Sequence, residues 1–180
     1  MLEDYKKHCK EREEMGIPPL PLSAEQTADV VNLLKKEHQD NELLLHLLKE
    51  RVPAGVDDAA YVKAGFLSDL TKGETESPYI SKEDAVAILG TMLGGYNIQP
   101  LIDCLEIEGL ADDAATALSN TLLIFDAFND IYELSKTNVH ARTVIDSWAN
   151  AEWFTSKEEI SESIKPVSYT HLTLKTTLTV

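Results

Sequence analysis

The sequence has too few cysteines for a disulfide framework and no apolar run long enough to cross a membrane. Its two cysteines, Cys9 and Cys104, lie far apart and form no CxxC motif, so we interpret both as reduced thiols. A membrane-spanning helix needs about 20 consecutive apolar residues, and no stretch of the chain approaches that length. Residues 1–15 are densely charged and lack the apolar core of a secretory signal. These absences favour a cytoplasmic protein without a membrane contact.

Basic residues are scarce. The chain has 16 Lys and Arg residues against 31 Asp and Glu residues, which gives a formal net charge of −15 over 180 residues. Nucleic-acid binding usually requires a basic surface that displaces counterions from phosphates. The densest basic group, within residues 6–12, is interleaved with acidic residues, and we interpret it as a solvated helix face. The composition therefore favours protein partners over RNA.

Catalytic signatures are missing as well. The sequence contains no HExxH motif, no nucleophile elbow and no kinase signature. Gly94 and Gly95 are adjacent, but a nucleotide-binding fingerprint needs a longer glycine pattern after a strand. We interpret the two glycines as a turn with positive φ or as a point of close packing.

Two histidines leave a metal site open as a hypothesis. His38 and His46 are close in sequence to Glu37, Asp40 and Glu42, and side chains of these types can ligate metal ions. The two histidines are, however, expected on different helices. We therefore favour solvated helix ends over a metal centre.

What the sequence does contain is a succession of short helices with their own start and stop signals. Ser23–Gln26 and Ser81–Asp84 have the form of capping boxes, in which two side chains satisfy free N–H groups at a helix start. Apolar residues recur at spacings of three and four between these signals and the glycines or prolines that follow. The expected helices cover residues 2–15, 23–34, 41–48 (capped by Asn41), 57–72 (capped by Asp57), 81–93, 100–108, 111–134 (with a bend or break near Asp126) and 139–153.

These segments predict an all-α fold. Helices joined by short loops form antiparallel pairs, and stacking the pairs buries faces that no single pair can bury, as in an α-solenoid. A compact bundle stays open, because no repeat of fixed period is evident. The helical domain is predicted to span residues 1–164. Residues 165–180 are rich in threonine and lack acidic side chains, so we predict a non-native or disordered tail.

An aromatic cluster near the end of the helical part is the candidate site. Trp148, Trp153 and Phe154 lie within seven positions. We favour core packing of the last helix pair for them, and the alternative is an interface with another domain, since tryptophan is enriched at interface hot spots. The residues themselves indicate no catalytic group, no bound cofactor and no metal ligand.

Several segments, in order, are similar to the N-terminal domain of the aconitase B family. They are residues 51–67 (RVPAGVDDAAYVKAGFL), 89–98 (LGTMLGGYNI), 117–126 (ALSNTLLIFD) and 147–154 (SWANAEWF). Several long matches in the same order are far more specific than any single motif. The resemblance departs at residues 165–166, where the threonine-rich tail begins.

The resemblance implies a HEAT-like α-solenoid placed ahead of catalytic domains. It further implies a homodimer, packing against the catalytic domains and a regulatory contact with mRNA, the last of which the acidic charge does not support. The complete enzyme of the family interconverts citrate and isocitrate through cis-aconitate in the tricarboxylic acid cycle, using a 4Fe–4S cluster. Its cluster cysteines and catalytic base lie in later domains, so none is expected in this chain. The function expected from the resemblance is an interaction and dimerisation domain; an RNA-binding element and an unrelated acidic adaptor are the alternatives.

Overall fold

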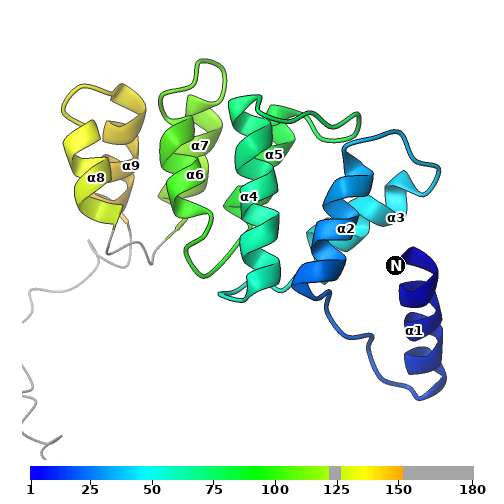
Figure 1. Ribbon diagram of the computed structural model, residues 1–180. Coiled ribbons are helices and arrows are strands. Elements are labelled where there is room, and N and C mark those ends of the chain that lie inside the picture. The colour runs from blue at the N-terminus through cyan, green and yellow to red at the C-terminus, as the bar shows by residue number, and fades with distance from the viewer. Residues whose placement is uncertain (122–126, 152–180) are drawn as a thin grey trace, which may run out of the picture.

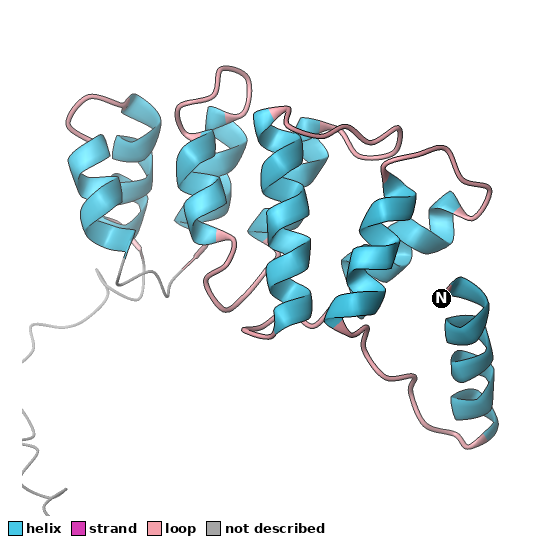
Figure 2. Ribbon diagram, in the orientation of Figure 1, coloured by secondary structure: helices cyan, strands magenta, loops and turns pink. Residues whose placement is uncertain are grey.

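The computed structural model describes residues 1–121 and 127–151, and all regular structure in these ranges is helical (Figure 2). The elements are α1 (Leu2–Glu14), α2 (Ala24–Leu34), α3 (Asn41–His46), the π-helix η1 (Leu47–Arg51), α4 (Asp58–Lys72), α5 (Lys82–Gly90), α6 (Ile98–Cys104), α7 (Ala111–Ser119), α8 (Phe128–Leu134) and α9 (Val139–Ala149). The predicted all-α class is thereby confirmed. The predicted tail at residues 165–180 lies outside the described residues, as does the end of the predicted domain.

From α4 onward, consecutive helices form pairs that stand side by side along the molecule (Figure 1). α4 packs on α5, α6 on α7, and α8 on α9, while α5, α7 and α9 also contact one another in turn. α2 contacts α4 and so connects the first helices to the series. One cluster of buried apolar side chains runs through the helices from α1 to α9.

The predicted helix caps at Ser23, Asp57 and Ser81 are present in the structure. The Ser23 hydroxyl accepts from the N–H of Gln26, and the Gln26 side chain accepts from the N–H of Ser23. Ser81 and Asp84 form the same reciprocal pair at the start of α5. The Asp57 carboxylate caps α4, which ends at Gly73 with a φ of 74°. Because free N–H groups at helix ends are costly when buried, these bonds set where each helix begins.

Hydrogen bonds join the N-terminal helix to the segment that follows it. Tyr5 is buried and donates its hydroxyl to the Leu20 carbonyl at 2.9 Å, while His8 Nε2 accepts from the Leu20 N–H at 3.1 Å. The Arg51 side chain donates to the carbonyls of Pro19 and Leu20 and to the Tyr5 hydroxyl. Arg51, at the end of η1, thus holds the segment that connects α1 to α2.

Several predicted helix boundaries differ from the structure; α5 and α6, for example, end earlier than expected, at Gly90 and Cys104. The tract expected over residues 111–134, with a bend or break near Asp126, is divided into α7, which ends at Ser119, and α8, which begins at Phe128; residues 122–126 lie outside the described residues. The side chains of Asn120 and Thr121 donate to carbonyls of the last turn of α7, at 2.9 and 3.0 Å. Such local bonds offer the backbone an alternative to continuing the helix.

The helix expected over residues 41–48 also differs from the prediction. Its N-cap position is Asp40 rather than Asn41, and the Asn41 side chain instead accepts from the adjacent Glu42 N–H at 2.8 Å. The helical run continues beyond Leu48 as the π-helix η1, up to Arg51. The side-chain contacts of Arg51 to the N-terminal turn hold this extension in place.

Candidate functional site

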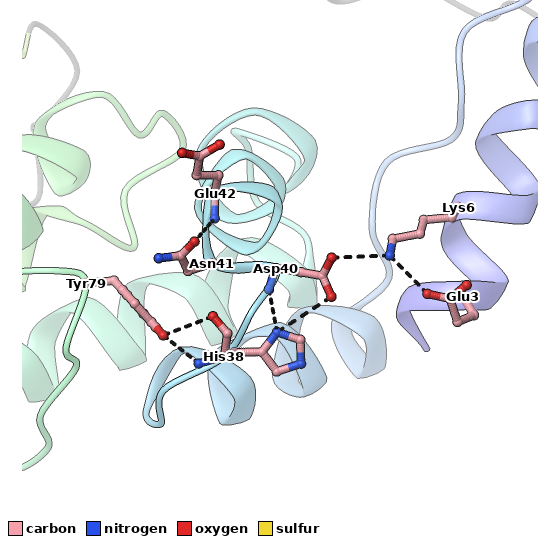
Figure 3. Close-up of polar contacts among 7 residues, drawn as sticks. All are labelled: Glu3, Lys6, His38, Asp40, Asn41, Glu42 and Tyr79. Carbon is pink, nitrogen blue, oxygen red and sulfur yellow. Dashed lines mark hydrogen bonds and ion pairs between the residues drawn. The ribbon is translucent and has the colours of Figure 1, made fainter.

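Of the residues considered as metal ligands, His38 and Asp40 form a structural contact between α1, the loop before α3 and the loop before α5 (Figure 3). The Tyr79 hydroxyl accepts from the His38 N–H and donates to the His38 carbonyl at 3.1 Å. The Asp40 N–H donates to His38 Nδ1 at 3.0 Å, and the Asp40 carboxylate lies 3.4 Å from the Lys6 ammonium. Lys6 also pairs with Glu3 at 3.0 Å. These contacts tie the first helix to two loops that are distant in sequence.

This cluster does not assemble a metal centre. Glu42 turns away from His38 in Figure 3, and the Nδ1 lone pair of His38 is already occupied by the Asp40 N–H. Across residues 1–121 and 127–151, no group of three His, Cys, Asp or Glu side chains could hold a metal ion. Hydrogen bonds to Glu3 and Asp40 raise the pKa of Lys6 above its usual value, opposed only by slight burial, so Lys6 stays charged in this contact.

The glycine pair at 94–95 forms a turn with positive φ, and Gly94 also approaches the backbone of Gly55 closely. Both residues have positive φ, 93° and 99°. A Cβ on Gly94 would lie 2.7 Å from the carbonyl oxygen of Gly55, so a side chain there would collide with the facing loop. The Leu93 N–H donates to the Ala54 carbonyl at 2.9 Å and joins the same two loops. Gly94 therefore serves loop-to-loop packing, whereas Gly95 has no atom within 4 Å of a Cβ and is distinguished by its positive φ alone.

Of the predicted aromatic cluster, the structure describes only Trp148. Its indole nitrogen donates to the Leu118 carbonyl at 3.2 Å, and its ring stacks on Phe128 with centroids 6.2 Å apart. Phe128 stacks in turn on Tyr132, also at 6.2 Å. Trp148 is half-buried against the core, which agrees with the core interpretation for this residue. Trp153 and Phe154 lie outside the described residues.

Three exposed apolar side chains form a surface that the sequence did not predict. Val56 is 71% exposed, Leu93 68% and Tyr61 64%. We call these three residues the loop patch. Tyr61 is one of the apolar residues that recur at helical spacing along residues 57–72, yet its side chain lies on the solvent side of α4. It shares the face of α4 with Asp58, Gly65, Ser68 and Lys72, a polar pattern that marks the solvent side and could have revealed its position.

A buried lysine was also missed. Lys63, on α4, is 4% exposed, and burial lowers its pKa against the opposing attraction of Glu50. Its ammonium group donates to the Lys49 carbonyl at 3.4 Å, within η1. Lysine usually marks an exposed position, so a single sequence gave no signal for this contact. The geometry is that of a side chain satisfying a carbonyl in the last helical turn.

The comparisons with known proteins decide the family. Residues 4–154 match the family described as the aconitate B N-terminal domain. The chain belongs to this family. Among curated proteins, it is similar to aconitate hydratase B of Synechocystis (53% identical over 167 residues), of Salmonella typhimurium (55% over 166) and of Escherichia coli (53% over 166). Each comparison covers 91% of this chain but only 19% of the relative, so the chain spans about a fifth of the length of these relatives.

The cysteines of this aconitase B domain do not fit an iron–sulfur cluster. Such clusters are held by several thiolates brought together in space. Cys9 is half-buried on α1, whereas Cys104 is fully buried at the end of α6, and the two belong to separate parts of the fold. Burial raises the pKa of the Cys104 thiol, which disfavours the thiolate that a metal would need. No cluster chemistry can therefore be assigned to this domain.

Within the part of the aconitase B domain that the structure describes, none of the helices combines the length and the apolarity that crossing a membrane requires.

Proposed function

We propose that this chain is the N-terminal interaction domain of an aconitate hydratase B, which packs against the catalytic domains of the same polypeptide and contributes to a homodimer. The observation that carries the proposal is the match of residues 4–154 to the N-terminal family domain, in a chain that spans only 19% of its relatives. The activity of the whole protein is then the interconversion of citrate and isocitrate in the tricarboxylic acid cycle, carried out by domains that follow this one.

The helix arrangement supports a HEAT-like stack as the architecture of the domain. Contacts of α2 with α4, α5 with α7 and α7 with α9 connect neighbouring pairs, and each pair meets its neighbours in sequence rather than a common centre. In such stacks each unit contacts only its neighbours, which leaves an extended surface free for partners. The charge supports a protein partner, because 31 acidic residues against 16 basic ones disfavour contact with phosphates.

Binding in trans tests the proposal. The 180-residue chain is titrated by calorimetry into Escherichia coli aconitate hydratase B from which the matched N-terminal region has been removed. We expect saturable binding that changes little between 50 and 200 mM salt, whereas a contact with phosphates weakens by about 10³-fold or more over this range. A 200-nucleotide RNA is titrated in parallel. Saturable binding to the RNA alone would contradict the proposal and favour the nucleic-acid alternative.

A further inference from the structure

We propose that the loop patch, formed by Val56, Tyr61 and Leu93, is the surface against which the polypeptide that follows residue 151 in longer members of this family packs. The inference rests on the proposed function, because it assigns the contact surface of an interaction domain. It specifies where on the domain the contact surface lies, that the contact is mostly apolar, and which residues make it.

The three side chains belong to one connected surface. The Tyr96 hydroxyl donates to the Val56 carbonyl at 3.0 Å, and the Tyr96 ring meets the Tyr61 ring edge-on, with centroids 5.4 Å apart. Leu93 is joined to the same loop through its N–H bond to Ala54. Single exposed apolar residues are ordinary, but apolar side chains gathered in one place mark interaction sites.

The loops that carry the patch are held in a defined conformation. Gly94 packs directly against the backbone of Gly55, with no room even for a Cβ between the two loops. Bonds from Leu93 and Tyr96 fix both sides of this approach. A partner therefore meets loops whose backbones are already fixed, and preorganisation of this kind lowers the entropic cost of binding.

The surroundings of the patch suit a mostly apolar contact. Residues 52–58 and 91–97 contain only two formally charged side chains, Asp57 and Asp58, in a chain in which 26% of residues are charged. The centres of protein interfaces are depleted of charge and enriched in aromatic residues. The facing surface is therefore apolar, with basic residues opposite the two aspartates.

The chain leaves the described domain on the edge where the patch lies. At the other edge, α7 and α9 begin together, since His140 Nδ1 lies 3.0 Å from the Asp112 carboxylate. They also end together, where Trp148 bonds to the Leu118 carbonyl. The end of α5 belongs to the edge where α7 and α9 end, because Gly90 packs against Ala117 near the end of α7. The loop with Leu93 follows α5, so it shares an edge with the exit at residue 151 (Figure 1).

The length of the relatives indicates which polypeptide covers the loop patch. The matched region covers 19% of each of them, so about four fifths of their polypeptide lies outside it. A polypeptide that continues from residue 151 begins on the edge of the patch and needs no crossing of the stack to cover it. A second copy of the chain has no such tether, and the following polypeptide is therefore the occupant we assign.

Amide hydrogen exchange tests this assignment in a full-length protein. Residues 1–154 of this chain replace the matched region of Escherichia coli aconitate hydratase B, and exchange is compared with that of the free 180-residue chain. We expect the amides of residues 54–57 and 93–96 to exchange at least about tenfold more slowly in the chimera. Residues 73–80 and 105–110, in the loops of the opposite edge, should exchange equally in both proteins.

A double variant, Val56→Ser with Leu93→Ser, serves as the second arm. Both side chains are exposed, so the free chain should keep its melting temperature, while the chimera should lose the protection at residues 54–57 and 93–96. The matched control is Val139→Ser, at a side chain that is 67% exposed on the opposite edge, which should change neither protein. Equal exchange of the two loops in chimera and free chain would overturn the assignment. If other segments are protected instead, the interaction function stands; if none is, the proposed function fails with it.

Discussion

The indole nitrogen of Trp148 donates a hydrogen bond to the backbone carbonyl of Leu118, 3.2 Å away, and so joins the ends of α9 and α7. Leu118 is fully buried, and its carbonyl closes the last turn of α7. The tryptophan ring at the same time stacks on Phe128 at the start of α8. One side chain therefore connects three helices at the edge where the chain leaves the described domain.

Replacing Trp148 tests this connection. Trp148→Ala should destabilise the chain by about 2–4 kcal/mol, because it removes a large half-buried ring and its packing against the core. Trp148→Phe keeps most of the apolar contact and loses only the hydrogen bond, which contributes about 1 kcal/mol. Urea unfolding followed by circular dichroism measures both. Equal losses for the two variants would show that the ring contributes little and that the hydrogen bond dominates.

Two glycines inside helices should respond in opposite directions to alanine. A Cβ at Gly90 would lie 2.9 Å from the Cβ of Ala117, so Gly90→Ala should push α5 away from α7 and lower the melting temperature. Gly65, within α4, has no neighbouring atom within 4 Å of a new Cβ. Gly65→Ala should therefore stabilise the chain by up to about 1 kcal/mol through helix propensity alone. Stabilisation by both variants would show that α5 and α7 are less closely packed than the structure indicates.

The capping box at the start of α5 makes stability depend on pH. Hydrogen bonds from the Ser81 N–H and hydroxyl lower the pKa of the Asp84 carboxyl below its usual 3.8. A lowered pKa in the folded state stabilises the fold above the unfolded pKa, and this contribution is lost as pH falls through the folded value.

Asp84→Asn should therefore be less stable than the parent chain near pH 6, and the difference should shrink below about pH 4. Urea unfolding at a series of pH values from 6 to 3 measures it. Asp58→Asn, in the first turn of α4, is the control for the general effect of removing a negative charge near a helix start. A difference that stays constant down to pH 3 would contradict the role of the Asp84 carboxylate.

The start signals of the helices could be predicted because they are local. Ser23 and Asp57 need only the next three residues to form their caps, and the sequence contains that information. The contact between Gly94 and Gly55 could not be predicted, since it joins loops about forty positions apart whose meeting depends on how α4 packs on α5. The same holds for η1, which is fixed by the side-chain bonds of Arg51 to the N-terminal turn.

Of the candidate site, too, some features could be predicted from the sequence and others could not. The amphipathic pattern of its helix favoured core packing for Trp148, and the structure has this side chain half-buried against the core. The exposure of Val56 and Leu93 could not be read from one sequence, because isolated apolar residues in loops carry no periodic pattern. The exposure of Tyr61 could have been predicted, because the polar residues on the same face of α4 indicate the solvent side.

The isolated chain should not form an iron–sulfur cluster. Cys9 and Cys104 belong to separate parts of the fold, and a buried neutral thiol at Cys104 is a poor ligand. After anaerobic incubation with iron and sulfide and removal of unbound metal, we expect no absorbance near 400 nm above that of the Cys104→Ala variant, and no conversion of citrate to isocitrate. Stoichiometric iron and sulfide on the parent chain alone would overturn this expectation.

Sedimentation velocity on full-length proteins tests the central claim, that this chain is an interaction domain, most directly. Three proteins are compared: Escherichia coli aconitate hydratase B, the same protein without the matched N-terminal region, and the chimera that carries residues 1–154 of this chain. Removal of the region should lower the fraction of dimer, and the chimera should restore it to the level of the full-length relative. A truncated protein that dimerises as well as the full-length relative would contradict the account.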